Sequence, residues 1–150
     1  MAARVKILLI CDDQGFSNYF KEQLFISGEY AIAVEPTSQA AVLSLSKVIH
    51  DLIFVKYATP ETDIASLMFE LKKVDPDCTV VVLFDIQRDG LINEFEELGV
   101  FESMLWPASA DKLKFIIDKG AKLHVLLAAS RRINQGLKEH NQALERQSTL

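Results

Sequence analysis

The sequence is poor in cysteine, with only Cys11 and Cys78 in 150 residues, and both lie in apolar, strand-like segments. So few cysteines exclude a small disulfide scaffold, and we expect two buried free thiols, as a reducing cytoplasm maintains. Apolar runs such as 80–84 are far shorter than the roughly 20 residues that cross a bilayer, and no signal-peptide pattern opens the chain. We therefore expect a cytoplasmic protein with no membrane association.

Signatures of phosphate binding, metal binding and catalysis are also missing. The chain has no GxGxxG motif for a dinucleotide and no GxxxxGK[ST] loop for a nucleoside triphosphate. Its histidines, His50, His124 and His140, are scattered without metal-ligand spacing. No Ser–His–Asp or Cys–His arrangement is evident, so the sequence does not predict an enzyme.

Charge is distributed unevenly along the chain. Residues 1–120 carry 11 Lys and Arg against 19 Asp and Glu, a net charge of −8, whereas residues 121–150 carry 5 against 2, a net charge of +3. An acidic main domain argues against a nucleic-acid partner, and the tail is too dilute in positive charge for a DNA-binding arm. The tail is more typical of a separate structural unit.

Five apolar runs of strand length recur along the chain. They start near Val5, Tyr30, Leu52, Thr79 and Glu102. Three of them are continuous rather than alternating, which is typical of parallel strands covered on both faces by helices. Segments with helical spacing separate them, with Thr37 or Ser38 and Asp63 as candidate N-caps and Gly99 as a helix stop. The pattern predicts an α/β fold, a flavodoxin-like (βα)5 doubly wound parallel sheet over residues 1–120, followed by a long helical extension.

Two adjacent carboxylates, Asp12 and Asp13, follow the first predicted strand. The carboxyl ends of the strands form the working site of a doubly wound sheet, so this loop is the first place to look for chemistry. A buried acidic pair needs a cation or a Lys or Arg partner. Helix capping with both carboxylates solvated is the simpler alternative.

Over residues 4–120 the sequence resembles the receiver domains of bacterial response regulators. The resemblance rests on ILLICDDQ, on DLIFVKYATPETD (51–63), on TVVVLF and on GVFESMLWP (99–107), which occur in family order and at family spacing. In that family, the acidic pair and an aspartate ending the third strand bind Mg²⁺, and this aspartate accepts a phosphoryl group. A Ser or Thr ending the fourth strand and a Lys before a late Pro contact the phosphate.

The resemblance implies a receiver scaffold without receiver chemistry. The phosphoacceptor position falls on Lys56, the Ser/Thr position on Phe84, the Lys position on Trp106 and the aromatic switch position on Ser103, while Pro107 is kept. An amine cannot form an acyl phosphate as a carboxylate can. Phe84 has no hydroxyl, and Trp106 offers only an indole N–H. This pattern predicts a degenerate receiver without a phosphoacceptor.

We expect Lys56 to take the cation's place beside Asp12 and Asp13, with Asp85 as a further partner. Two carboxylates and one ammonium carry a formal charge of −1, whereas a working receiver clusters three carboxylates to hold Mg²⁺. No metal site or other cofactor is therefore expected, and Mg²⁺ binding should be weak or lost. A Lys56 side chain simply solvated at the strand end is the alternative, and the phosphoacceptor is missing in either case.

The last thirty residues, 121–150, lack proline and are rich in strong helix formers. A heptad frame has apolar residues at five of its eight seam positions: Leu123, Leu126, Ile133, Leu137 and Leu144. We expect a coiled-coil-like helix that forms a homodimer and leads toward an output module beyond residue 150. A helix that folds back on the domain and a frayed linker are the alternatives.

These features predict a degenerate receiver domain in two-component, phosphorelay signalling that binds protein partners and dimerises independently of phosphorylation. One alternative is a phosphorelay receiver that uses an unconventional acceptor or responds to partner binding. Another is a flavodoxin-like small-ligand binder with a site lined by Asp12, Asp13, Lys56 and Asp85. A third is a purely structural dimeriser.

Overall fold

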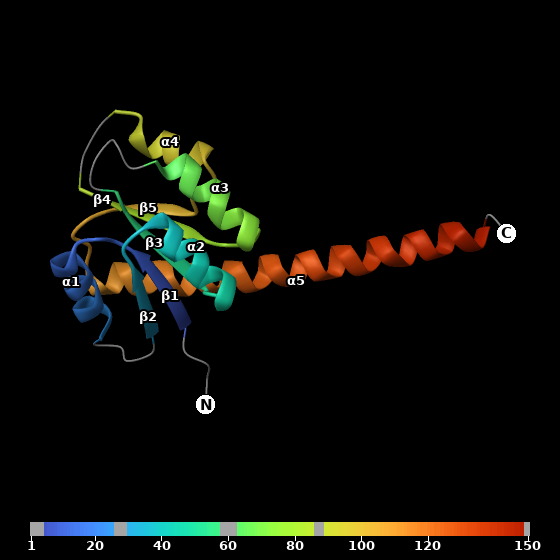
Figure 1. The fold of residues 1–150 in the computed structure, drawn as a ribbon, viewed down its shortest axis with the longest axis horizontal. Helices are drawn as coiled ribbons and strands as arrows, with labels where there is room; N and C mark the ends of the chain where they lie inside the picture. Colours follow the sequence, from blue (N-terminus) through green and yellow to red (C-terminus); the bar gives the residue numbers. More distant parts are fainter. Residues whose placement is uncertain (1–4, 26–29, 58–62, 86–88, 149–150) are drawn as a thin grey trace.

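The computed structural model describes residues 5–25, 30–57, 63–85 and 89–148, and side-chain surroundings as far as residue 137. Its five strands are β1 (Val5–Ile10), β2 (Tyr30–Glu35), β3 (Leu52–Tyr57), β4 (Val80–Phe84) and β5 (Glu102–Leu105). They form one parallel sheet in the order β2-β1-β3-β4-β5 (Figure 1). The predicted flavodoxin-like, doubly wound fold is confirmed.

Helices alternate with the strands and cover both faces of the sheet. They are α1 (Gln14–Phe25), α2 (Ser38–Lys47), α3 (Ile64–Val74), α4 (Leu91–Glu97) and α5 (Ala110–Ser148). One core lies between the sheet and α2, α3 and α4, and a second lies between the sheet and α1 and α5 (Figure 1).

The continuous apolar strands follow from this double covering. Ile53 and Phe54 are neighbours on β3 and both are fully buried, yet Ile53 belongs to the core under α2–α4 and Phe54 to the core under α1 and α5. Successive side chains of a strand point to opposite faces, so a strand covered on both sides needs apolar residues throughout. Burying each such side chain contributes about 1.5–3 kcal/mol to folding.

Local capping fixes where the helices begin and end. The Thr37 hydroxyl accepts a hydrogen bond from the Ala40 N–H (3.1 Å), and the Asp63 carboxylate accepts one from the Ser66 N–H (2.9 Å). Gly99 follows α4 with a φ of +84°, a backbone conformation that favours glycine. The predicted caps and the predicted helix stop are confirmed, and of the two candidates before α2 the cap is Thr37.

The last helix, α5, is 39 residues long and continues without a break past residue 120. Its first turns bury Leu113, Ile116 and Ile117 against the sheet, and its outer part projects away from the domain (Figure 1). No change of backbone marks the predicted boundary between domain and extension, which stays a prediction. Within the described ranges, no helix combines the length and apolar character that a membrane span needs.

Candidate functional site

The pairing of β1 with β3 brings the acidic loop and Lys56 to the same edge of the sheet. Ile10, the last residue of β1, is the register partner of Val55, so Lys56 of β3 lies beside the start of the loop that follows β1. The Lys56 Nζ lies 3.2 Å from the Asp13 Oδ2, with the lysine side chain 19% and the aspartate side chain 51% exposed. Lys56 therefore forms an ion pair with one member of the acidic pair.

Asp13 serves two partners at once. Its Oδ1 accepts a hydrogen bond from the Phe16 N–H (3.1 Å) at the first turn of α1, while its Oδ2 accepts one from Lys56. The Phe16 N–H and the Lys56 ammonium together lower the pKa of the Asp13 carboxyl below its usual value. Asp13 is therefore an ionised carboxylate held by a helix N-terminus and an ammonium.

Asp12 and Asp85 do not share in this ion pair. Both are exposed, and among the described residues Asp13 is the carboxylate that Lys56 contacts. Lys56 pairs in register with Leu83, so Asp85 lies two residues farther along the chain, just past the end of β4 and about 7 Å beyond the level of Lys56. The structure thus differs from the expectation that Lys56 lies between two aspartates with Asp85 as an additional partner.

These donors do not fit a magnesium ion. Mg²⁺ takes oxygen ligands in near-octahedral geometry, whereas this site presents an ammonium bound to one of its two carboxylates. In the part of the chain that the structure describes, no group of three or more His, Cys, Asp or Glu side chains could hold a metal ion. The Lys56 ammonium supplies positive charge beside Asp13.

An aromatic cluster borders the ion pair on the α1 side. The Trp106 ring lies 4.9 Å from Phe16, 5.6 Å from Tyr19 and 5.9 Å from Phe20, measured between ring centroids. The Lys56 Nζ lies 5.0 Å from the centroid of the Phe16 ring, within range of a cation–π contact. Trp106 therefore packs against α1, and Lys56 lies between a carboxylate and an aromatic face.

Three further residues, which the resemblance to receiver domains singles out, form no hydrogen bond or salt bridge with the ion pair among the described residues. Phe84 is buried at the end of β4, with its ring centroid 6.1 Å from that of Phe95. Ser103 is half-buried on β5 in register with Val82, and Pro107 is exposed after a cis peptide bond with Trp106. Phe84 thus presents a packed aromatic ring without a hydroxyl.

Both cysteines are buried free thiols, as expected. Cys11 precedes the acidic pair, and its Sγ exchanges 3.3 Å hydrogen bonds with the backbone of Asp13. Burial raises the pKa of the Cys11 thiol, and burial raises the pKa of Cys78 to about 11. Neither sulfur is a thiolate nucleophile at neutral pH.

Two contacts that the sequence analysis missed attach α5 to the loop between α3 and β4. The His124 Nε2 lies 2.8 Å from the Asp75 Oδ2, and both side chains are largely buried. The Arg131 guanidinium donates to both carboxylate oxygens of Asp77, at distances of 2.9–3.1 Å. These bonds lower the pKa of the Asp77 carboxyl. They hold α5 to the domain beyond residue 120.

The face of α5 that points away from the domain carries exposed apolar side chains. Phe115, Leu126, Ile133 and Leu137 are all exposed, and at 3.6 residues per turn they lie within about 20° of one line along the helix. We call these four residues the α5 stripe. Of the other predicted seam positions, Leu123 is half-buried, and the side chain of Leu144 lies outside the described residues.

No family model matches the chain, and no curated protein sequence matches it. Solved structures do match. A response-regulator receiver domain from Clostridium thermocellum superposes with a TM-score of 0.72 at 22% identity, covering 82% of this chain and 98% of that one. The signal receiver domain of a Luxo repressor protein from Vibrio parahaemolyticus superposes with a TM-score of 0.73 at 18% identity, covering 85% and 97%.

A third match is the receiver domain of a sensor histidine kinase from Pseudomonas aeruginosa. It superposes with a TM-score of 0.65 at 19% identity, covers 80% of this chain and 99% of that one, and has magnesium coordinated in its active-site cleft. These likenesses confirm the predicted receiver-domain fold for this chain.

Proposed function

We propose that this chain is a receiver-like domain of two-component signalling that works through protein contacts and needs no phosphorylation. The observation that carries the proposal is the ion pair between Lys56 and Asp13 at the carboxyl end of the sheet. Its ammonium stands where the resemblance expects a phosphoacceptor carboxylate. The two free thiols suit a reducing cytoplasm, where such signalling takes place.

The chemistry of the pocket supports a permanently fixed state. In a working receiver, the charge of the pocket changes when Mg²⁺ and the phosphoryl group bind and when they are lost. Here the positive charge belongs to the chain, and the Lys56 side chain is mostly buried between Asp13 and the Phe16 ring. Phe84 and Trp106 provide packing where a phosphate would need a hydroxyl and an ammonium. We infer that contacts with partners, rather than phosphorylation, change the state of the domain.

Dimerisation through α5 is the second part of the proposal. The buried Leu113, Ile117 and His124 occupy one side of the helix, and the α5 stripe occupies the opposite side. A second copy of the chain presents an identical stripe, so two helices side by side cover each other's apolar residues. The helix continues for 28 residues past Gly120, about 42 Å, which is longer than the domain needs for its own packing.

The proposal is tested by intact-mass measurement after incubation with Mg²⁺ and acetyl phosphate. We expect no mass increase, and no increase after incubation with a phosphorylated histidine kinase domain. An acid-labile gain of one phosphoryl group, lost on mild base treatment, would contradict the proposal. It would favour the alternative of a phosphorelay receiver with an unconventional acceptor.

A further inference from the structure

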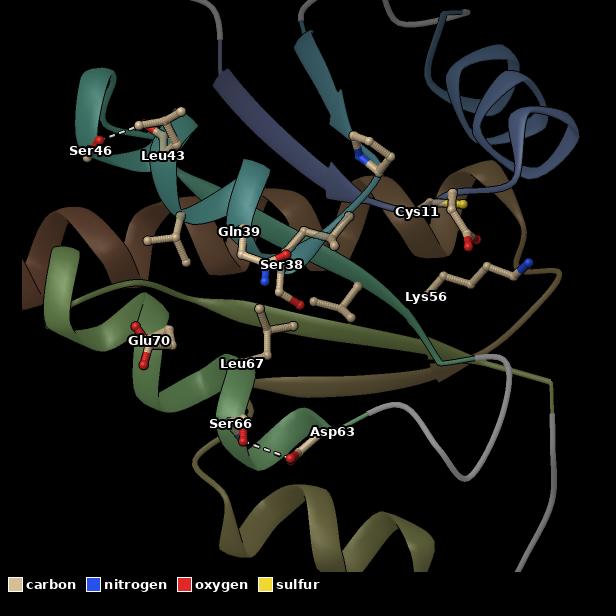
Figure 2. Close-up of a pocket in the computed structure, with 15 residues that line it drawn as sticks. Cys11, Ser38, Gln39, Leu43, Ser46, Lys56, Asp63, Ser66, Leu67 and Glu70 are labelled. Atoms are coloured by element: carbon tan, nitrogen blue, oxygen red, sulfur yellow. Dashed lines mark hydrogen bonds between the residues drawn. The ribbon is translucent and has the colours of Figure 1, made fainter.

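A cavity of about 1050 Å³ lies between α2 and α3 and opens toward the carboxyl end of the sheet (Figure 2). Its apolar lining includes Ile10 of β1, Val55 of β3, Val42 of α2 and Leu67 of α3. Sites for small molecules are usually about 300–1,000 Å³, with a mostly apolar lining and a few polar groups that orient the ligand. The cavity has the size and the apolar lining of such a site.

Some polar groups of the lining already have hydrogen-bond or ion-pair partners within the protein, and others do not. Lys56 is bound to Asp13, and the Asp63 carboxylate accepts hydrogen bonds from the Ser66 N–H and hydroxyl. Asp12 lines the cavity and, among the described residues, has no hydrogen bond or ion pair. The Asp12 carboxylate is therefore a lining charge that is available to a ligand.

The charged side chains of the lining favour a positively charged ligand. The three carboxylates of Asp12, Asp63 and Glu70 face one ammonium, that of Lys56, for a formal charge of −2. This ammonium is bound to Asp13, which lies outside the described lining. A nucleotide or another phosphate ester would be repelled by the unpaired Asp12 carboxylate, whereas a cation would be attracted both by the lining and by the acidic domain around it.

We propose that this cavity is a binding site for a small organic cation, an amine or amidinium group attached to an apolar body. The cationic group pairs with Asp12, and the body packs on Ile10, Val42, Val55 and Leu67. Glu70, at the other end of the cavity, faces Lys73 at 3.6 Å and contributes less (Figure 2). The site shares Asp12 and Lys56 with the candidate functional site, but the proposal does not depend on the interaction function proposed above.

Three probes with the same apolar body and different charge test the proposal: 4-phenylbutylamine, 4-phenylbutanol and 4-phenylbutyrate. Each is titrated into the full chain while backbone amide resonances are followed by NMR. We expect saturable shifts in α2 and α3 with the amine, at least about fivefold weaker binding of the alcohol, and no saturable shifts with the carboxylate.

Variants locate the binding. Asp12→Asn should weaken binding of the amine by about three- to fivefold and leave binding of the alcohol unchanged. Glu70→Gln should weaken binding of the amine by less. Glu22→Gln on α1 makes the same change of net charge away from the cavity and should leave both probes unaffected. Val42→Phe fills the cavity and should abolish binding, with an unchanged melting temperature showing that the variant folds.

Several outcomes would overturn the proposal. These are equal affinity for all three probes, shifts on the α5 stripe instead of α2 and α3, or unchanged amine binding to the Asp12→Asn variant. Shifts in α2 and α3 with an amphipathic Lys–Leu peptide but not with the amine would assign the cavity to a protein partner and would also overturn it.

Discussion

Arg131 binds Asp77 across 54 residues of sequence, with its Nη2 2.9 Å and its Nε 3.0 Å from the carboxylate oxygens. Arg131 lies on the outer part of α5 and Asp77 on the loop before β4. About two turns earlier, His124 makes a 2.8 Å contact with Asp75 of the same loop. The domain therefore sets the direction in which α5 projects, and a movement of this loop would be passed to the helix.

Removing the guanidinium should loosen this attachment. We expect Arg131→Gln to lower the melting temperature by about 2–4 °C and to speed amide hydrogen exchange in α5 around residue 124. Arg132→Gln is the matched control, because Arg132 is exposed on the same turn and has no described partner. Equal effects of the two variants would show that the contact with Asp77 does not stabilise the helix.

His50 should make stability depend on pH. Burial lowers the pKa of its imidazole, and its Nδ1 has no hydrogen-bond partner among the described residues. The unfolded chain therefore takes up a proton near pH 6.5 that the folded chain resists, so stability is full above that pH and falls below it. Urea midpoints measured from pH 8 to pH 5 should fall less for His50→Gln than for the parent chain. Parallel curves for the two proteins would contradict this account.

Two glycines of α5 should respond to alanine in opposite directions. A Cβ on Gly120 would lie 2.6 Å from the Leu52 Cδ1 and 3.3 Å from the Phe101 Cε2, whereas a Cβ on Gly136 would meet nothing within 4 Å. Because Leu52 is fully buried, we expect Gly120→Ala to cost about 1–3 kcal/mol in the free energy of urea unfolding. Gly136→Ala should add about 0.5–1 kcal/mol. A gain in stability at both positions would show that α5 does not pack closely at Gly120.

Dimerisation should depend on one side of α5. Leu126 and Val125 are adjacent and similarly exposed, at 65% and 58%, but Val125 points about 100° away from the α5 stripe. We expect Leu126→Asp to make the chain monomeric in sedimentation equilibrium and Val125→Asp to leave it dimeric. A monomeric parent chain, or equal effects of the two changes, would remove the support for the proposed dimer.

The sheet and its helices were predictable because local rules decide them. Apolar strands such as 80–84 need covering on both faces, and Thr37 and Asp63 follow ordinary capping chemistry. The proximity of Lys56 to the acidic loop also follows from topology, because parallel strands end at the same edge of the sheet. Which aspartate the lysine binds depends on side-chain direction and on the demand of α1 for a cap, so the sequence did not reveal it.

The contacts of α5 could not be read from the sequence. Asp75 and His124 are 49 residues apart, and only the packing of α5 on the sheet brings them together. The heptad frame begins at Leu123, which is half-buried, and it omits Phe115. An isolated helix shows its period but not which side its own domain covers, so the exposed stripe emerged only from the folded chain.

The central claim is that the Lys56 ammonium substitutes for a divalent cation beside Asp13. The most direct test is Mg²⁺ binding, measured by NMR titration, for the parent chain, Lys56→Asp and Lys56→Gln. We predict no saturable binding to the parent chain and binding to Lys56→Asp at least about tenfold tighter than to Lys56→Gln, because only the aspartate restores a third carboxylate. Mg²⁺ binding by the parent chain as tight as that by Lys56→Asp would contradict the account.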